Sequence, residues 1–436
     1  MSNKNIILTH YGGIKAPYLP LGTLYIANSL QNQGYSPKLV PSNTSESKFE
    51  SILSELKPLY VGFSVFTSPQ ISEMITLSKL TKQLGFNTVW GGYHPTVLAE
   101  QCLKEPFVDY VIRGEGDEIS GIFTRQLAEG NLEKKTIFES ARIINNLDEF
   151  KPALNLVNLK DYVTTIQPHL RKKYGTLNSL GYILTSRGCL SNCKFCGVHA
   201  IYKDSKKAIW NTHSSNFVHE QVTYIKSNIP ELESIVIWDD NFFRSNLLEE
   251  RSKKILEGLM DENLKFTIEA RGTFLCDKEN VKFLKNTGCL QVFIGAESGS
   301  QAVLNSMRKN TKVTDYLKAV ENCLDEDLPI RLSFFYGYPG ETLEDINKTK
   351  EFLGLLKNYG ERVTISGPKM YRPVPGTEGF KEAVKLGFIP PEDTQGWARV
   401  NSNTDPTLLP WLINESKREG IKDNQIYEWL GIRMNS

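Results

Sequence analysis

The stretch TSRGCLSNCKFCGVHAIY, residues 185–202, carries the strongest structural signal in this chain. It places Cys189, Cys193 and Cys196 within eight residues, separated by three and then two residues. Three thiolates at this spacing can turn around one cube of iron and sulfide without help from elsewhere. A 4Fe–4S cluster held entirely by protein takes four cysteines, and no fourth lies nearby. One iron is therefore left open for an external ligand.

Zinc is the competing interpretation, because short-spaced cysteines also bind it, and His199 could supply the fourth ligand of a closed site. The position favours the cluster: the cysteines follow the first strand of a strand–helix series, which is a catalytic position in a parallel barrel. Zinc ribbons instead lie on hairpins. The scattered cysteines are interpreted as buried free thiols; they are Cys102, Cys276, Cys289 and Cys323.

The chain around and after the cysteines predicts a partial barrel of parallel strands over residues 179–385. Apolar runs mark the expected strands at 182–186, 234–238, 266–270, 290–294, 331–336 and 363–367, separated by helical patterns such as 246–260, 277–287, 312–325 and 343–358. In such barrels the chemistry lies at the carboxyl ends of the strands. Residues 386–436, with Trp397, Trp411 and Trp429, are expected to form a helical extension.

Residues 1–145 predict a separate α/β domain. Apolar runs at 5–9, 36–40, 59–65, 87–91 and 109–114 alternate with helical patterns, which indicates a doubly wound, Rossmann-like parallel sheet with helices on both faces. Residues 146–178 show no sustained period and are expected to be a linker.

The C-x3-C-x2-C pattern, with the aromatic Phe195 before the last cysteine, resembles the signature of the radical SAM superfamily. The resemblance implies that S-adenosylmethionine (SAM) binds the open iron through its amino and carboxylate groups. An electron from the cluster then cleaves the sulfonium bond and releases a 5′-deoxyadenosyl radical. It also implies that the neighbourhood of Phe195 holds the adenine.

Later segments resemble the same family in order: WDDNFF (238–243), FTIEARG (266–272), GAESGSQAVLNSMRKN (295–310), YGYPGET (336–342) and PVPGTE (373–378). Taken alone, PGET is better interpreted as a turn followed by a helix N-cap at Thr342, and the order of all these segments behind the cysteines is what supports the resemblance. The resemblance assigns side chains to SAM as follows: Asp239, Asp240 and Asn241 to its ammonium or ribose, Glu269 and Arg271 to its two ends, and Glu297 and Ser298 to its methionine or ribose portion.

The first domain resembles the cobalamin-binding-like domain that precedes many radical SAM cores, through residues 18–35, 61–67, 91–100 and 109–118. Doubly wound sheets bind ligands beyond the strand carboxyl ends, and glycines there permit close backbone approach. The residues expected to contact cobalamin are Pro20, Gly22, Ser64, Gly91, Gly92, His94, Gly114 and Glu115. In LTHYGG (8–13), His10 and Gly13 match a cobalt-ligating motif, whereas Leu8 replaces its Asp.

The leading functional hypothesis is a cobalamin-dependent methyltransferase of a small-molecule natural-product or cofactor precursor, reduced by a flavodoxin- or ferredoxin-type protein. The alternative is a cobalamin-independent radical SAM decarboxylase, cyclase, epimerase or dehydrogenase. With 51 basic and 50 acidic residues, the charge argues against nucleic acid as a partner. No apolar run approaches the roughly 18 residues of a membrane span, so we expect a cytoplasmic protein.

Overall fold

The structure is a computed structural model that describes residues 4–12, 18–139, 144, 146–202, 210–400 and 408–418. The chain forms two compact units. The first comprises Met1–Tyr162, Ala200–Lys203 and Pro390–Ser402, and the second comprises Val163–His199, Asp204–Ile389 and Asn403–Ser436. The expected linker, 146–178, is thus shared between them. Gly13, Trp429 and the rest of the expected extension beyond residue 418 lie outside the described residues.

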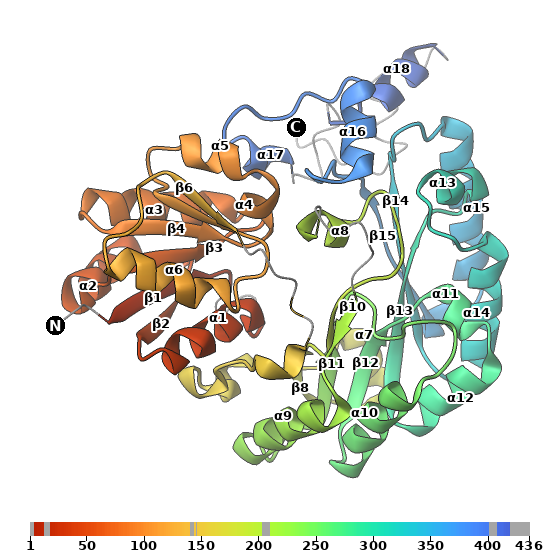
Figure 1. The fold of residues 1–436 in the computed structure, drawn as a ribbon. Helices are drawn as coiled ribbons and strands as arrows, with labels where there is room; N and C mark the ends of the chain where they lie inside the picture. The colour runs from red at the N-terminus through yellow and green to blue at the C-terminus, as the bar shows by residue number, and fades with distance from the viewer. Residues whose placement is uncertain are drawn as a thin grey trace. The chain divides into compact units, whose positions relative to one another are not determined.

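The first unit contains a fully parallel six-stranded sheet, in the order β2-β1-β3-β4-β5-β6 (Figure 1). The strands are β1 (Asn5–His10), β2 (Ser36–Pro41), β3 (Tyr60–Ser64), β4 (Asn87–Gly91), β5 (Tyr110–Arg113) and β6 (Thr136–Glu139). The predicted doubly wound sheet is confirmed. The edge strand β6 was not predicted, because four half-exposed residues carry too little apolar pattern. The strand order reverses between β1 and β3, so these two strands flank the switch point.

Helices cover both faces of this sheet. They are α1 (Leu21–Asn32), α2 (Glu46–Leu56), α3 (Ile71–Gln83), α4 (Tyr93–Val97), α5 (Ala99–Lys104) and α6 (Ile119–Ala128). Helix α1 packs with α6, and α2 packs with α3. Phe123 of α6 is fully buried and meets Tyr60, Tyr110 and Phe138 edge-on, with ring centroids 5.4–5.6 Å apart. This aromatic cluster joins α6 to three strands.

The second unit contains a curled, open half-barrel (Figure 1). Its order is β15-β14-β13-β12-β11-β8-β7, formed by β7 (Val163–Thr165), β8 (Asn178–Ile183), β11 (Ser234–Ile237), β12 (Lys265–Glu269), β13 (Cys289–Glu297), β14 (Ile330–Tyr336) and β15 (Val363–Met370). Only β7 runs antiparallel to its neighbour in this sheet. The predicted partial barrel of six parallel strands is confirmed. A short antiparallel pair, β9 (Ser186–Gly188) and β10 (Trp210–Thr212), follows β8.

The larger helices lie on the outside of the curled sheet (Figure 1). The α-helices described after residue 162 are α7 (Pro168–Tyr174), α8 (Val198–Ile201), α9 (Ser215–Asn228), α10 (Glu250–Asp261), α11 (Gly272–Leu275), α12 (Lys278–Asn286), α13 (Gln301–Ser306), α14 (Val313–Asp325), α15 (Leu343–Lys357), α16 (Glu378–Lys385), α17 (Trp397–Val400) and α18 (Pro410–Arg418). Of these, α17 belongs to the first unit. Thr342 caps α15 in a reciprocal capping box with Asp345, which confirms the expected N-cap. No helix in the described ranges has the length and apolar character that crossing a bilayer requires.

Replacing Phe123 by alanine should destabilise the first unit strongly. The substitution removes a buried ring from the aromatic cluster, and such changes cost about 3–5 kcal/mol. Urea unfolding followed by circular dichroism measures the effect. The neighbouring Ile122, which is 42% exposed on the same helix, is the matched control, and Ile122→Ala should change stability by about 0.5 kcal/mol or less. Equal shifts in the two variants would contradict the assignment of Phe123 to the core.

Candidate functional site

The three clustered cysteines lie between β9 and α8, just beyond the first parallel strand of the half-barrel. All are free thiols; Cys193 is buried, whereas Cys189 and Cys196 are partly exposed. The backbone N–H of Ser191 donates to the Cys189 sulfur over 3.4 Å. Burial raises the pKa of Cys193, and it raises the pKa of Cys196 to about 12, with the neighbouring thiols adding to both shifts. Binding of iron would therefore release protons from these thiols.

The chemistry of these donors fits a cluster ligated through three irons. In a 4Fe–4S cluster each cysteine binds a different iron, so the sulfurs need not converge on one point. Within the described part of the chain, no three His, Cys, Asp or Glu side chains gather as ligands of a single ion.

The carboxylate of Asp239, directly after β11, holds the start of the cysteine segment. It accepts hydrogen bonds from the backbone N–H of Thr185 (2.6 Å), the Thr185 hydroxyl (2.5 Å) and the Ser186 hydroxyl (2.7 Å). Asp239 is only 2% exposed, and burial raises its pKa despite these bonds. Asp240 accepts from the Gly188 N–H at 3.0 Å. Two residues that the sequence assigned to SAM thus also contact the segment leading into the cysteines.

The backbone of Asn241 completes this support. Its carbonyl oxygen accepts from the indole N–H of Trp210 at 2.6 Å and from the Ser186 hydroxyl at 3.3 Å. The three consecutive residues after β11 therefore tie both strands of the small β9–β10 pair to the half-barrel.

A cluster of charged side chains lies at the ends of β12 and β13. Glu297 adopts φ +69° where β13 ends, and its carboxylate lies 3.0 Å from the ammonium nitrogen of Lys309. That ammonium also lies 5.5 Å from the ring centroid of Phe195. The pKa of Glu269 is raised to about 7, chiefly by burial; the charge of Lys309 opposes this shift, whereas the charges of Glu297 and Asp240 contribute to it. The structure thus brings the predicted residues Phe195, Glu269 and Glu297 into one neighbourhood.

Lys309 was not predicted as a site residue, although it lies in the segment that resembles the family. In the sequence, RKN reads as the polar end of a helix, and no periodicity reveals that the ammonium is buried. Desolvation acts to lower its pKa, but the charge and hydrogen bond of Glu297, together with Tyr316 and Cys193, outweigh it and raise the pKa above the usual value for lysine. The ammonium therefore stays charged.

Arg271 and Ser298, both assigned to SAM by the resemblance, make hydrogen bonds in different parts of the half-barrel. The guanidinium of Arg271 donates to the hydroxyl of Ser191, between the first two cysteines, and to the Lys309 carbonyl oxygen at 2.5 Å. Ser298 is fully buried, and its hydroxyl lies 3.1 Å from the hydroxyl of Thr349 on α15 while accepting the Ser300 N–H. Arg271 thus joins the cysteine segment to the charged cluster, whereas the Ser298 hydroxyl bonds to an outer helix.

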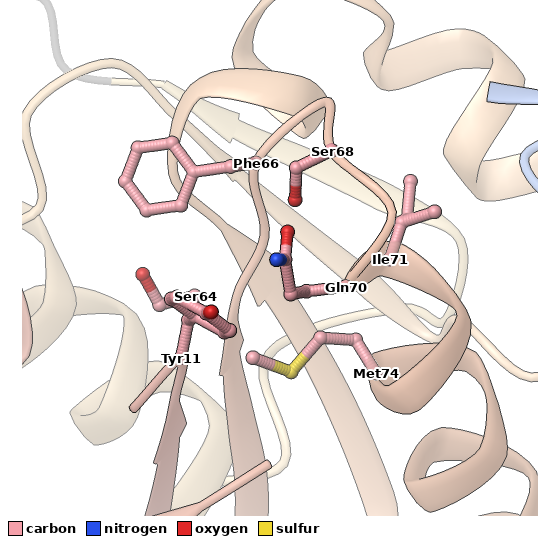
Figure 2. A pocket seen from close by; sticks show the side chains of 7 residues that line it. All are labelled: Tyr11, Ser64, Phe66, Ser68, Gln70, Ile71 and Met74. Carbon is pink, nitrogen blue, oxygen red and sulfur yellow. The ribbon is translucent and has the colours of Figure 1, made fainter. Parts of the chain in front are cut away.

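A separate cavity of about 220 Å³ lies in the first unit, at the switch point of its sheet. Figure 2 shows Tyr11 and Ser64 at the ends of β1 and β3, with Phe66 from the following loop and Met74 from α3. Phe66 is 55% exposed. Ser64 was a predicted residue; Tyr11 and Phe66 were not singled out, although each stands directly beyond a strand end. The lining is mainly apolar, with rings, a thioether and an aliphatic chain beside a few polar side chains, and its size suits one part of a large ligand such as cobalamin.

The predicted glycines of the first unit fall into two groups. At Gly22 and Gly114 an added Cβ would meet no atom within 4 Å, so the backbone there is open to close approach. At Gly92, with φ +97°, a Cβ would lie 3.0 Å from the Val65 carbonyl oxygen. Gly91 accepts the N–H of Val65 at 2.8 Å. Gly92 therefore allows α4 to pack against the loop after β3, and Gly91 joins that loop through its backbone carbonyl.

The other residues predicted to contact cobalamin, and the potential cobalt ligand His10, differ in burial and in hydrogen bonding. Pro20 precedes α1 as its N-cap residue, and Glu115 accepts from the Tyr202 hydroxyl at 3.2 Å. His94 is fully buried. His10, the potential cobalt ligand, is also buried, and its Nδ1 lies 3.2 Å from the Tyr11 carbonyl oxygen.

We expect the substitution Glu269→Gln to stabilise the cofactor-free protein at pH 8 but not at pH 5. The native pKa lies near 7, above the usual 4.5, so this carboxyl's contribution to stability falls as pH rises through that interval. At about 1.4 kcal/mol per pKa unit, the gain at pH 8 should reach about 1–3 kcal/mol in urea unfolding. The exposed Glu257→Gln is the control, and an equal gain at both pH values would contradict the burial argument.

Comparison with known proteins gives matches in both units. Residues 183–353 match the family model of the radical SAM superfamily, and residues 12–123 match that of the B12 binding domain. An uncharacterized methyltransferase of Pyrococcus horikoshii is 27% identical over 414 residues, covering 89% of this chain and 83% of the relative. The anaerobic magnesium-protoporphyrin IX monomethyl ester cyclase of Cereibacter sphaeroides is 25% identical over 461 residues, covering 97% and 71%.

Among solved structures, the radical SAM methyltransferase TsrM of Kitasatospora setae, with cobalamin and a [4Fe-4S] cluster bound, matches with a TM-score of 0.66. The match covers 88% of this chain and 76% of TsrM at 17% identity, a likeness of fold. Both matched segments contain the features described above, the switch-point cavity in one and the three cysteines in the other. The chain therefore contains a radical SAM domain preceded by a B12-binding domain.

Proposed function

We propose that this protein is a cobalamin-dependent radical SAM methyltransferase that acts on a small-molecule natural-product or cofactor precursor. The observation that carries the proposal is the cavity at the β1–β3 switch point, which lies in the segment that matches the B12-binding model. The switch point is where doubly wound sheets bind their ligands. The name of the Pyrococcus horikoshii relative, a methyltransferase, supports the same reaction.

Cys189, Cys193 and Cys196 would hold the 4Fe–4S cluster. When bound, the cluster and SAM supply radical chemistry, and cobalamin supplies methyl transfer. The carboxylates of Glu269 and Glu297 suit the ammonium of SAM, and Phe195 offers a flat face beside the adenine. Asp239, with its carboxylate bonded to Thr185 and Ser186, fits a positioning role better than direct contact with SAM.

Arg271 fits a second positioning role. Its guanidinium donates hydrogen bonds to both Ser191 and the Lys309 carbonyl. It would therefore fix the position of the cysteine segment relative to the charged cluster. Lys309 would hold the Glu297 carboxylate until the SAM ammonium arrives, because an unpaired buried carboxylate is costly. Asp240 and Asn241 remain candidates for the SAM ribose or ammonium, as does Ser298 for its methionine or ribose.

In the first unit, Ser64, Tyr11 and Phe66 would contact cobalamin inside the cavity. The open backbone at Gly22 and Gly114 would allow its edges to approach closely. Pro20, Gly91, Gly92 and Glu115 would border the same strand ends. His10 suits a cobalt ligand poorly, because it is buried beside the Tyr11 carbonyl.

A second candidate function is radical cyclisation. The Cereibacter sphaeroides relative, named as a cyclase, matches over 97% of this chain. Either reaction consumes low-potential electrons, for which we propose a flavodoxin- or ferredoxin-type donor. The free thiols Cys102, Cys276, Cys289 and Cys323 agree with a reducing compartment, so we place the protein in the cytoplasm.

The two candidate functions are expected to differ in how SAM is consumed. The anaerobically reconstituted, reduced protein should form S-adenosylhomocysteine only when cobalamin is added, because methyl donation leaves that product. 5′-Deoxyadenosine, the product of radical cleavage, should form with or without cobalamin. Liquid chromatography of both nucleosides gives the answer. Formation of 5′-deoxyadenosine alone in the cobalamin-loaded protein would reject the methyltransferase in favour of the cyclase.

Substituting alanine for any one of Cys189, Cys193 and Cys196 should abolish the iron–sulfur absorbance and 5′-deoxyadenosine formation. Each removes the sulfur that one iron requires, while the circular dichroism spectrum should stay unchanged. The partly exposed Cys276→Ala is the control and should keep both the absorbance and SAM cleavage. Full SAM cleavage by any of the three variants would overturn the assignment of the cluster.

A further inference from the structure

A short segment from beyond the half-barrel belongs to the first unit. We call residues 390–400 the strap. Its Trp397 is 1% exposed, and the indole N–H donates to the side-chain oxygen of Gln101 over 2.8 Å. The Gln101 amide in turn donates to the Pro391 carbonyl over 2.9 Å. The Thr394 N–H donates to Glu105 over 2.9 Å. The strap is thus fastened along its length to α5 and the residues that follow it.

Trp397 also contacts a buried histidine. The rings of Trp397 and His94 meet edge-to-face, with centroids 6.0 Å apart at 72°. His94 is fully buried, and burial lowers its pKa to about 3, so the ring stays neutral. Its Nδ1 lies 3.0 Å from the Thr67 hydroxyl, and its backbone N–H donates to the Val65 carbonyl at 3.0 Å. His94 therefore joins the strap to the loop after β3.

That loop lines the switch-point cavity. Thr67 lies between Phe66 and Ser68, and both neighbours line the cavity (Figure 2). The strap reaches the far end of the same segment as well, because the amide of Gln395 donates to the Ser72 hydroxyl over 3.1 Å. Ser72 directly follows Ile71, another lining residue. The strap is thus linked to the cavity-lining segment 66–71 at two points, through His94 to Thr67 and directly at Ser72.

We propose that the strap preorganises the cobalamin site, with Trp397 and His94 as positioning residues for segment 66–71. Neither side chain lines the cavity; they act by holding Thr67. An ordered loop lowers the cost of binding, since each immobilised side chain costs about 0.5–1.5 kcal/mol. The identity of the ligand rests on the proposed function. One consequence is that the B12-binding unit becomes fully competent only after the half-barrel and the strap have been synthesised.

The test is a titration of full-length, anaerobically reconstituted protein with hydroxocobalamin. Trp397→Ala should weaken cobalamin binding by about tenfold. This is the cost expected when roughly one or two loop side chains must be ordered on binding. Trp397→Phe keeps the ring on His94 and should bind within about threefold of the unchanged protein. Gln395→Ala removes only the Ser72 contact, at an exposed position, and should weaken binding by less than Trp397→Ala. Trp411→Ala, at a buried tryptophan of the second unit, should bind as the unchanged protein does.

A second readout needs no cobalamin. Amide hydrogen exchange of residues 65–72 should be faster in Trp397→Ala and His94→Ala than in the unchanged protein and in Trp411→Ala. If the unchanged protein binds no cobalamin, the proposed function fails, and this exchange result still decides whether the strap positions the loop. If the unchanged protein binds cobalamin while Trp397→Ala keeps its affinity and its exchange rates, the role of the strap is rejected. An unchanged circular dichroism spectrum confirms that each variant has folded, and the iron–sulfur absorbance confirms that its half-barrel is intact.

Discussion

Parallel strand pairing is the constraint on which the rest of this structure depends. A parallel sheet places the carboxyl ends of its strands at one edge, where the chain leaves the sheet and its side chains lose their neighbours. In the half-barrel, this edge carries Glu269 as the last residue of β12 and Glu297 as the last residue of β13. In the first unit it carries Tyr11 and Ser64. Although the two sheets differ in curvature, both therefore have their candidate sites at the carboxyl ends of parallel strands.

Electrostatics distinguishes the two sites. The half-barrel edge gathers acidic groups with the ammonium of Lys309 among them, and burial makes each unpaired charge costly. The raised pKa of Glu269 and the Glu297–Lys309 ion pair are two responses to that cost. Such a site suits a ligand that brings its own positive charge. The cavity in the first unit instead offers rings, a thioether and hydroxyl groups, which suits a large ligand bound over its face and edges.

Support for both sites comes from residues that line neither. Asp239 holds the start of the cysteine segment through Thr185 and Ser186, as His94 holds the cavity loop through Thr67. In each case a buried polar side chain forms hydrogen bonds with backbone or hydroxyl groups near the site. Because buried polar groups must find partners, such residues fix loop positions more sharply than apolar packing does.

The sequence by itself determined most strands of both sheets and the three cysteines, because apolar periodicity and ligand spacing are local properties. Five strands of the first sheet and six parallel strands of the second were predicted near their observed positions. The tertiary structure alone decided that Lys309 is buried against Glu297, that Asp239 turns toward Thr185, and that Trp397 packs on His94. These pairs lie 12 to about 300 positions apart in the chain. Only the packing of distant elements sets burial and partner, so no local pattern could reveal them.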